Sequence, residues 1–111
     1  MTPVTTTLSF GGDNPTLVRY PAGSAVITAT NDGTLEVTLT PITPRGGEAP
    51  VLPSSLRAFY GPSGQPKSVA DILPARAGRE RPPIHIKTGW ELYFEAYVGP
   101  TQNTQMLVAI L

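Results

Sequence analysis

The chain has 111 residues, a formal net charge of zero and only 14% charged residues, which suits one domain and argues against nucleic acid or an anionic membrane as a partner. It contains no cysteine, which excludes a disulfide framework and thiolate metal or redox chemistry. Its 13 prolines and 11 glycines make up more than a fifth of the chain, which indicates short strands joined by many turns.

Neither a targeting signal nor a membrane helix is expected. The segment Met1–Thr7 lacks the basic start and the long apolar run of a signal peptide. No segment approaches the roughly 20 apolar residues that a membrane helix needs. We therefore expect one domain over residues 1–111, with residues 1–10 as an N-terminal arm or strand.

The first part of the chain predicts two strands and a hairpin. Residues 4–10 are rich in threonine, which favours an extended backbone, and residues 16–20 form a second apolar run. In the hairpin, a three-residue loop ending at a left-handed Gly33 sets Ala29 opposite Leu35. Its outer face would be polar and exposed to solvent, formed by Thr28, Thr30, Thr34, Glu36, Thr38 and Thr40.

The middle of the chain alternates strands with two long loops. Residues 41–53 contain four prolines and predict a loop, because proline cannot donate a hydrogen bond to a strand ladder. Residues 56–60 predict a strand, and residues 69–73 a strand in preference to one helical turn. Residues 74–83 predict the second loop. It carries three arginines that would bind phosphate or an acidic protein surface, or would be solvated: Arg76, Arg79 and Arg81.

The longest period-two run, residues 89–99, predicts the central strand of a sheet. One face carries Trp90, Leu92, Phe94, Ala96 and Val98, and the other carries Glu91, Tyr93, Glu95 and Tyr97. Before it, a three-residue loop ending at a left-handed Gly89 sets Ile86 opposite Trp90 and His85 opposite Glu91.

After this run, residues 104–111 predict a second hairpin partner, with Val98 opposite Thr104 and Phe94 opposite Val108. In this register the face away from the core stays apolar. A patch of that kind needs a cover from the chain itself or from another subunit, so we expect an interface formed by Tyr93, Tyr97, Leu107, Ala109 and Leu111.

Short strands at this spacing, with no helical segment between them, indicate an all-β fold. We predict an antiparallel β-sandwich, Ig-like or jelly-roll, with about seven or eight short strands and two long proline-rich loops. A small barrel is the alternative.

No catalytic, cofactor or metal motif is present, and we expect no enzyme. His85 is the single histidine, and no nucleophile motif accompanies it and Glu91. Glu91 and Glu95 lie four residues apart on one strand, about 13 Å, which exceeds the spacing of glycosidase carboxylates. One histidine without cysteine cannot supply the usual zinc ligands.

Two binding alternatives stay open. Asp13, Asn14 and Asp32 offer oxygen ligands for calcium, but their spacing matches no EF-hand loop, and these residue types are ordinary in turns. Tyr93 and Tyr97 would suit a carbohydrate-binding module, since sugars stack on exposed aromatic rings.

The small size, the strand-rich layout and the ending Met106–Leu111 resemble the cysteine-free β-sandwich decoration, or cement, proteins of tailed bacteriophage heads. The resemblance implies a homo-oligomer, a trimer, that is assembled in the host cytoplasm and docks on the major capsid protein or another lattice protein at the virion surface. The proline-rich loops and the terminal arm would contact neighbouring subunits. A head-fibre base or a tail part would show the same size, strand content and apolar ending. The resemblance assigns no function to any individual residue.

Overall fold

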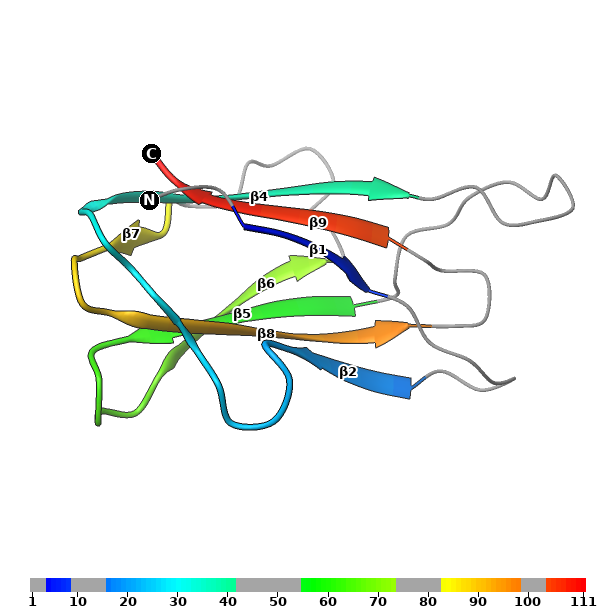
Figure 1. Ribbon diagram of the computed structural model, residues 1–111, viewed down its shortest axis with the longest axis horizontal. Helices are drawn as coiled ribbons and strands as arrows, with labels where there is room; N and C mark the ends of the chain where they lie inside the picture. The colour runs from blue at the N-terminus through cyan, green and yellow to red at the C-terminus, as the bar shows by residue number, and fades with distance from the viewer. Residues whose placement is uncertain (1–3, 9–15, 42–54, 74–82, 99–103) are drawn as a thin grey trace, which may run out of the picture.

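The computed structural model describes residues 4–8, 16–41, 55–73, 83–98 and 104–111, and these residues form nine strands and no helix (Figure 1). Seven strands have five to nine residues, and two have only two. The strands are β1 (Val4–Leu8), β2 (Thr16–Tyr20), β3 (Ile27–Thr28), β4 (Gly33–Pro41), β5 (Ser55–Gly61), β6 (Ser68–Leu73), β7 (His85–Ile86), β8 (Glu91–Val98) and β9 (Thr104–Ile110).

The strand pairs are nested around a single hairpin. β5 pairs with β6, β4 with β7, β2 and β3 with β8, and β1 with β9, and all of these pairs are antiparallel. Each pair encloses the previous one, so the chain runs as a long double ribbon whose closed end is the β5–β6 turn. β2 and β3 share one edge of β8, since Tyr20 is in register with Phe94 and Ile27 with Leu92.

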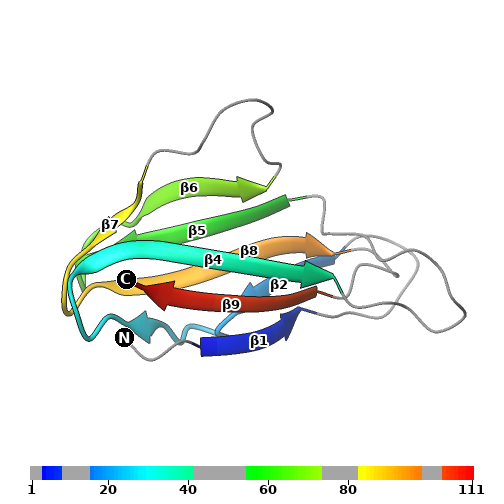
Figure 2. The same cartoon turned by 90° about the horizontal axis from the view of Figure 1, so that it is seen from above.

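Two further pairings, β9 with β4 and β8 with β5, roll this ribbon into two layers. One sheet has the order β1-β9-β4-β7, and the other has the order β2-β8-β5-β6 with β3 also on β8. Figure 1 shows the layers one above the other, and Figure 2 shows the four-stranded sheet lying over the five-stranded one. The predicted antiparallel β-sandwich is confirmed. Its nested order is that of a jelly roll and differs from the strand order of an Ig-like sandwich.

The predicted hairpins are wrong. β3 and β4, β7 and β8, and β8 and β9 are consecutive in sequence but lie in different sheets. Leu35 is in register with Ile110 in place of Ala29, and Gly33 with Ile86. An inward-facing apolar row suits a partner across the core as well as a partner in the same sheet, so alternation alone does not distinguish the two arrangements.

The core lies between the two sheets. The apolar face predicted for residues 89–99 is confirmed at Leu92, Phe94 and Ala96, which are at most 1% exposed. β8 lies between β2 and β5, which confirms its central position. Opposite it, β4 and β9 contribute Leu35, Met106, Val108 and Ile110. Full burial of a side chain such as Phe94 stabilises the fold by about 1.5–3 kcal/mol.

The exposure predicted for the polar residues between Thr28 and Thr40 is largely confirmed, but they do not form one face, because Thr28 lies on β3 in one sheet and Thr34–Thr40 on β4 in the other. Thr28, Thr30, Glu36, Thr38 and Thr40 are exposed, and Thr34 is half-buried. The strands predicted over residues 16–20, 56–60 and 69–73 are also present. Most of the two proline-rich loops, residues 42–54 and 74–82, and residues 1–3 of the predicted arm lie outside the described residues.

At one end of the sandwich, on the left in Figure 1, the chain crosses between the sheets at residues 29–32 and 87–90. The Trp90 N–H donates to the Lys87 carbonyl at 3.0 Å, which closes a turn. Gly89 has φ +87° in this turn, so its predicted left-handed conformation is confirmed. The same prediction for Gly33 is wrong, because Gly33 begins strand β4 and has no positive φ.

Candidate functional site

Among the described residues, three of the five exposed large apolar side chains lie on one surface. Leu17 is 50% exposed, Val69 52% and Tyr97 47%. All three project from the side of the five-stranded sheet that faces away from the core, because side chains alternate along a strand. This surface, called the five-strand face below, comprises Leu17, Arg19, Ser55, Arg57, Phe59, Val69, Asp71, Glu91, Tyr93, Glu95 and Tyr97.

A row of alternating charges crosses the five-strand face. Its members, each in register with the next, are Arg19 on β2, Glu95 on β8, Arg57 on β5 and Asp71 on β6. The Nε of Arg57 lies 3.2 Å from Oδ1 of Asp71, and both side chains are 61% exposed. An exposed ion pair of this kind stabilises a fold by about 0–1 kcal/mol. This pair therefore adds little to folding and leaves the charges of Arg57 and Asp71 available to a partner.

An aromatic row runs beside the charges. The rings of Phe59 and Tyr93 are stacked, with centroids 4.6 Å apart and an interplanar angle of 5°. The Arg19 guanidinium carbon lies 4.2 Å from the centroid of the Tyr93 ring. Because β2 and β5 flank β8 on opposite sides, both faces of the Tyr93 ring are covered. Tyr93 therefore has no open face on which a sugar could stack.

A shallow pocket of about 250 Å³ opens on the same surface. It lies where the small side chain of Ser55 stands in register with the bulky Tyr97. Its other lining residues are Leu17, Arg57 and Glu95. The pocket therefore combines an apolar wall, an aromatic ring, a hydroxyl and two opposite charges.

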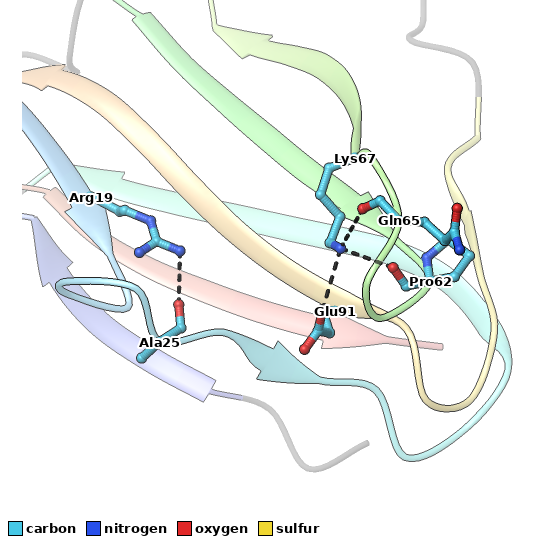
Figure 3. A network of polar contacts seen from close by, with 6 residues as sticks. All are labelled: Arg19, Ala25, Pro62, Gln65, Lys67 and Glu91. Atoms are coloured by element: carbon cyan, nitrogen blue, oxygen red, sulfur yellow. Dashed lines mark hydrogen bonds and ion pairs between the residues drawn. The ribbon is translucent and has the colours of Figure 1, made fainter.

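Two basic side chains, Lys67 and Arg19, make polar contacts at the borders of the five-strand face (Figure 3). The Lys67 ammonium lies 3.3 Å from Oε1 of Glu91, and it donates to the carbonyls of Pro62 at 2.9 Å and Gln65 at 3.0 Å. Arg19 donates to the Ala25 carbonyl at 2.9 Å. Lys67 thus holds the β5–β6 turn against β8, and Arg19 is anchored at the β2 edge.

The predicted interface residues do not form one surface. Tyr93 and Tyr97 lie on the five-strand face, whereas Leu107 and Ala109 face outward from β9 in the other sheet, and Leu111 follows β9. Leu107 is 37% exposed and Leu111 73%, but Ala109 is only 8% exposed. Arg76, Arg79 and Arg81 lie outside the described residues.

The other sequence candidates are not brought together. His85 on β7 is in register with Thr34, and Glu91 on β8 binds Lys67, so the predicted His85–Glu91 pair does not form. Within the described ranges, no group of three or more His, Cys, Asp or Glu side chains is placed to hold a metal ion. That part of the chain also contains no helix with the length and apolarity needed to cross a membrane.

The carboxylate of Asp32, which the sequence offers as a calcium ligand, accepts hydrogen bonds from the protein itself. Its Oδ1 accepts hydrogen bonds from the backbone N–H and the hydroxyl of Thr88. These bonds, the backbone one first, together with the nearby charge of Lys87, hold the pKa of Asp32 below its ordinary value of 3.8. Asp13 and Asn14 lie outside the described residues.

Sequence reasoning missed the residues that give the five-strand face its charge and its stacked rings. Arg19, Arg57, Phe59 and Asp71 each lie on strands that were correctly predicted, but they were not placed side by side. The turn-forming residues between β5 and β6 were the available signal, since a hairpin there brings Arg57 beside Asp71. The long-range pairing of β8 with β2 and β5 had no such local signal. Comparisons with protein-family models, with curated proteins and with solved structures found no match for this chain.

Proposed function

We propose that this chain is a non-enzymatic structural protein of a virion, a decoration or cement protein that docks as an oligomer on a bacteriophage capsid and stabilises it. One observation carries the proposal: three of the five exposed large apolar side chains among the described residues, together with a row of charges, gather on one sheet face, as association with another protein chain requires. The jelly roll agrees with this role by analogy, since viral capsid domains use it.

The docking contacts with the lattice protein would come from the two loops, which leaves the five-strand face to association between copies of the chain. Prolines in residues 41–53 restrict the backbone before binding, so less conformational entropy is lost when the loop docks. Arg76, Arg79 and Arg81 would make bidentate contacts with carboxylates of the lattice protein. Many copies that bind weakly can together reinforce a shell through avidity.

Particle binding tests this proposal. Virions from the source culture are purified on a density gradient and stripped of the protein, and the purified chain is added back and followed by co-sedimentation. The variant with Arg76, Arg79 and Arg81 all changed to Glu should lose binding while keeping its thermal unfolding midpoint. The matched variant with all three changed to Lys retains the charge and should bind in part. Full binding by the Glu variant, or no binding by the native chain, would refute the proposal.

A carbohydrate-binding module is the second candidate, favoured by the pocket beside Tyr97. Glu95, Arg57 and Ser55 there supply the donors and acceptors that sugar hydroxyls need, and Tyr97 offers a half-exposed ring. Because the ring of Tyr93 is covered, Tyr97 alone would stack on the sugar. Glycan-array binding that disappears in Tyr97→Ala and persists in Tyr93→Ala would support this candidate over particle docking.

A further inference from the structure

The charge row on the five-strand face is complementary to its own reverse. From β2 to β6 its charges run positive, negative, positive, negative, and from β6 to β2 they run in the opposite signs. When two copies are placed face to face, with the row of one reversed over the row of the other, Arg57 of each copy lies over Glu95 of the other copy. The same reversal brings Arg19 over Asp71 at each edge.

Two directions of a twofold axis in the plane of the face keep the strands of both copies aligned, and only one of them pairs opposite charges. An axis parallel to the strands, between β8 and β5, reverses the row and pairs opposite charges. An axis along the row leaves the strand order unchanged, so Arg57 would face Arg57 and Glu95 would face Glu95. Facing like charges across an interface is unfavourable by several kcal/mol, so the charge pattern selects the first axis.

The shape of the face agrees with the same axis. β8 of one copy lies over β5 of the other, so Tyr97 faces Ser55 of the second copy, and the large ring meets the small side chain beside the pocket. Four residues earlier on β8, Tyr93 faces Phe59 of the second copy in the same way. The exposed side chains of Leu17 and Val69 lie on the outer strands β2 and β6, at the two edges of the paired faces.

We infer that two copies of this chain associate through their five-strand faces, about a twofold axis that runs parallel to the strands between β8 and β5. Four strands spaced about 4.8 Å apart, with rows over about 20 Å, give roughly 400 Å² of contact per chain, or about 800 Å² in total, which is less than stable complexes bury and is the size of a weak, transient interface. The dimer therefore forms at micromolar or higher concentration. Because its charges are near solvent, added salt weakens it.

Two complementary single variants test the inference by sedimentation velocity of the purified chain over a concentration series. Arg57→Glu makes the centre of the face negative, and Glu95→Arg makes it positive. Each variant alone should sediment as a monomer where the native chain dimerises, with an association constant lowered at least tenfold. An equimolar mixture should regain dimers. In the mixed pair the introduced carboxylate of one chain faces the introduced guanidinium of the other, and the native Glu95 of the first chain faces the native Arg57 of the second.

Recovery in the mixture separates an intermolecular contact from an effect on folding, since mixing cannot repair a chain that is internally damaged. If either variant fails to fold, single cysteines in this cysteine-free chain provide a second measurement. In the Ser55→Cys dimer, the cysteines of the two chains are displaced from each other across the strands by one strand spacing, about 4.8 Å. In the Val69→Cys dimer, the displacement is three strand spacings, about 14 Å. A short bifunctional thiol reagent should therefore cross-link the first variant and not the second.

A native chain that stays monomeric up to millimolar concentration overturns the inference. A trimer, a mixture that remains monomeric, or equal cross-linking at both cysteines overturns it as well. The inference deepens the oligomer part of the proposed function and is judged on the purified chain alone. Particle binding by a monomeric chain would therefore refute this pairing and the oligomer part of the proposed function, and it would leave docking on the lattice protein standing.

Discussion

The carboxylate of Asp32 accepts two hydrogen bonds from Thr88, a residue 56 positions later in the chain. Its Oδ1 lies 2.7 Å from the backbone nitrogen and 2.9 Å from the hydroxyl oxygen of Thr88. Asp32 belongs to the crossing from β3 to β4, and Thr88 to the turn from β7 to β8. One side chain thus connects the two crossings at this end of the sandwich.

The first prediction concerns Asp32 and pH. Thr88 lowers the pKa of Asp32 below 3.8, so the carboxylate contributes stability above that pH and loses it as the pH falls through the lower folded-state pKa. Asp32→Asn should therefore lower the urea midpoint at pH 7, and the gap from the native chain should shrink below pH 3.8. Thr88→Val removes the hydroxyl donor and keeps the backbone donor, so it should lower the urea midpoint at pH 7 by less than Asp32→Asn does. A gap that stays constant down to acid pH would contradict this assignment.

The second prediction separates two glycines that are needed for different reasons. A Cβ on Gly33 would lie 2.5 Å from the carbonyl oxygen of Leu111. A Cβ on Gly89 would meet nothing within 4 Å, but the φ angle of +87° at this position strains the backbone of any residue that has a side chain. Gly33→Ala and Gly33→Asn should both cost about 1–3 kcal/mol through overpacking. At Gly89, Asn should cost less than Val, because Asn adopts left-handed backbone more readily.

Chemical denaturation of these four variants measures the difference. Equal losses for Gly89→Asn and Gly89→Val would argue that backbone strain is not what requires glycine in the 87–90 turn. A Gly33→Ala chain as stable as the native chain would mean that β4 and Leu111 can separate without cost.

The third prediction concerns Lys67, whose side chain is 13% exposed and whose partner Glu91 is 24% exposed. The ammonium has three acceptors, the Glu91 carboxylate and two carbonyls of the β5–β6 turn. We expect a coupling of about 1 kcal/mol between Lys67→Met and Glu91→Gln in a double-mutant cycle. Arg57→Met with Asp71→Asn is the matched exposed pair and should show a smaller coupling. Equal couplings would mean that burial adds nothing to the Lys67 contact.

The sequence was sufficient for the strands and, in β4, β8 and β9, for the side that is buried. In β8, alternation correctly assigned Leu92 and Phe94 to the core and Tyr97 to the surface, because burial on one face leaves a local period of two. The left-handed Gly89 was also recognisable, since the turn requirement is local.

Strand pairing could not be obtained in the same way. Phe94 was expected opposite Val108, and both are buried, but they belong to opposite sheets. A row of apolar residues that packs across the core satisfies the same alternation as one that pairs within a sheet. The charge row depends on the pairing of β8 with both β2 and β5, so it could not be recognised before the sheet order was known.

The last prediction compares two aromatic residues of β8, three positions apart, that face opposite sides of the sheet. Phe94 is 1% exposed within the core, and Tyr97 is 47% exposed on the five-strand face. Phe94→Ala should destabilise the chain by about 3–5 kcal/mol, because it removes buried apolar area and leaves a cavity. Tyr97→Ala should lower the unfolding free energy of the monomer by less than about 1 kcal/mol. The variant should nevertheless associate more weakly than the native chain, since it lacks the ring that faces Ser55 of the second copy. Thermal unfolding at low concentration reports the first quantity, and sedimentation at high concentration reports the second. If Tyr97→Ala lowered monomer stability as much as Phe94→Ala does, the ring of Tyr97 would be part of the folding core and could not be counted as a docking residue.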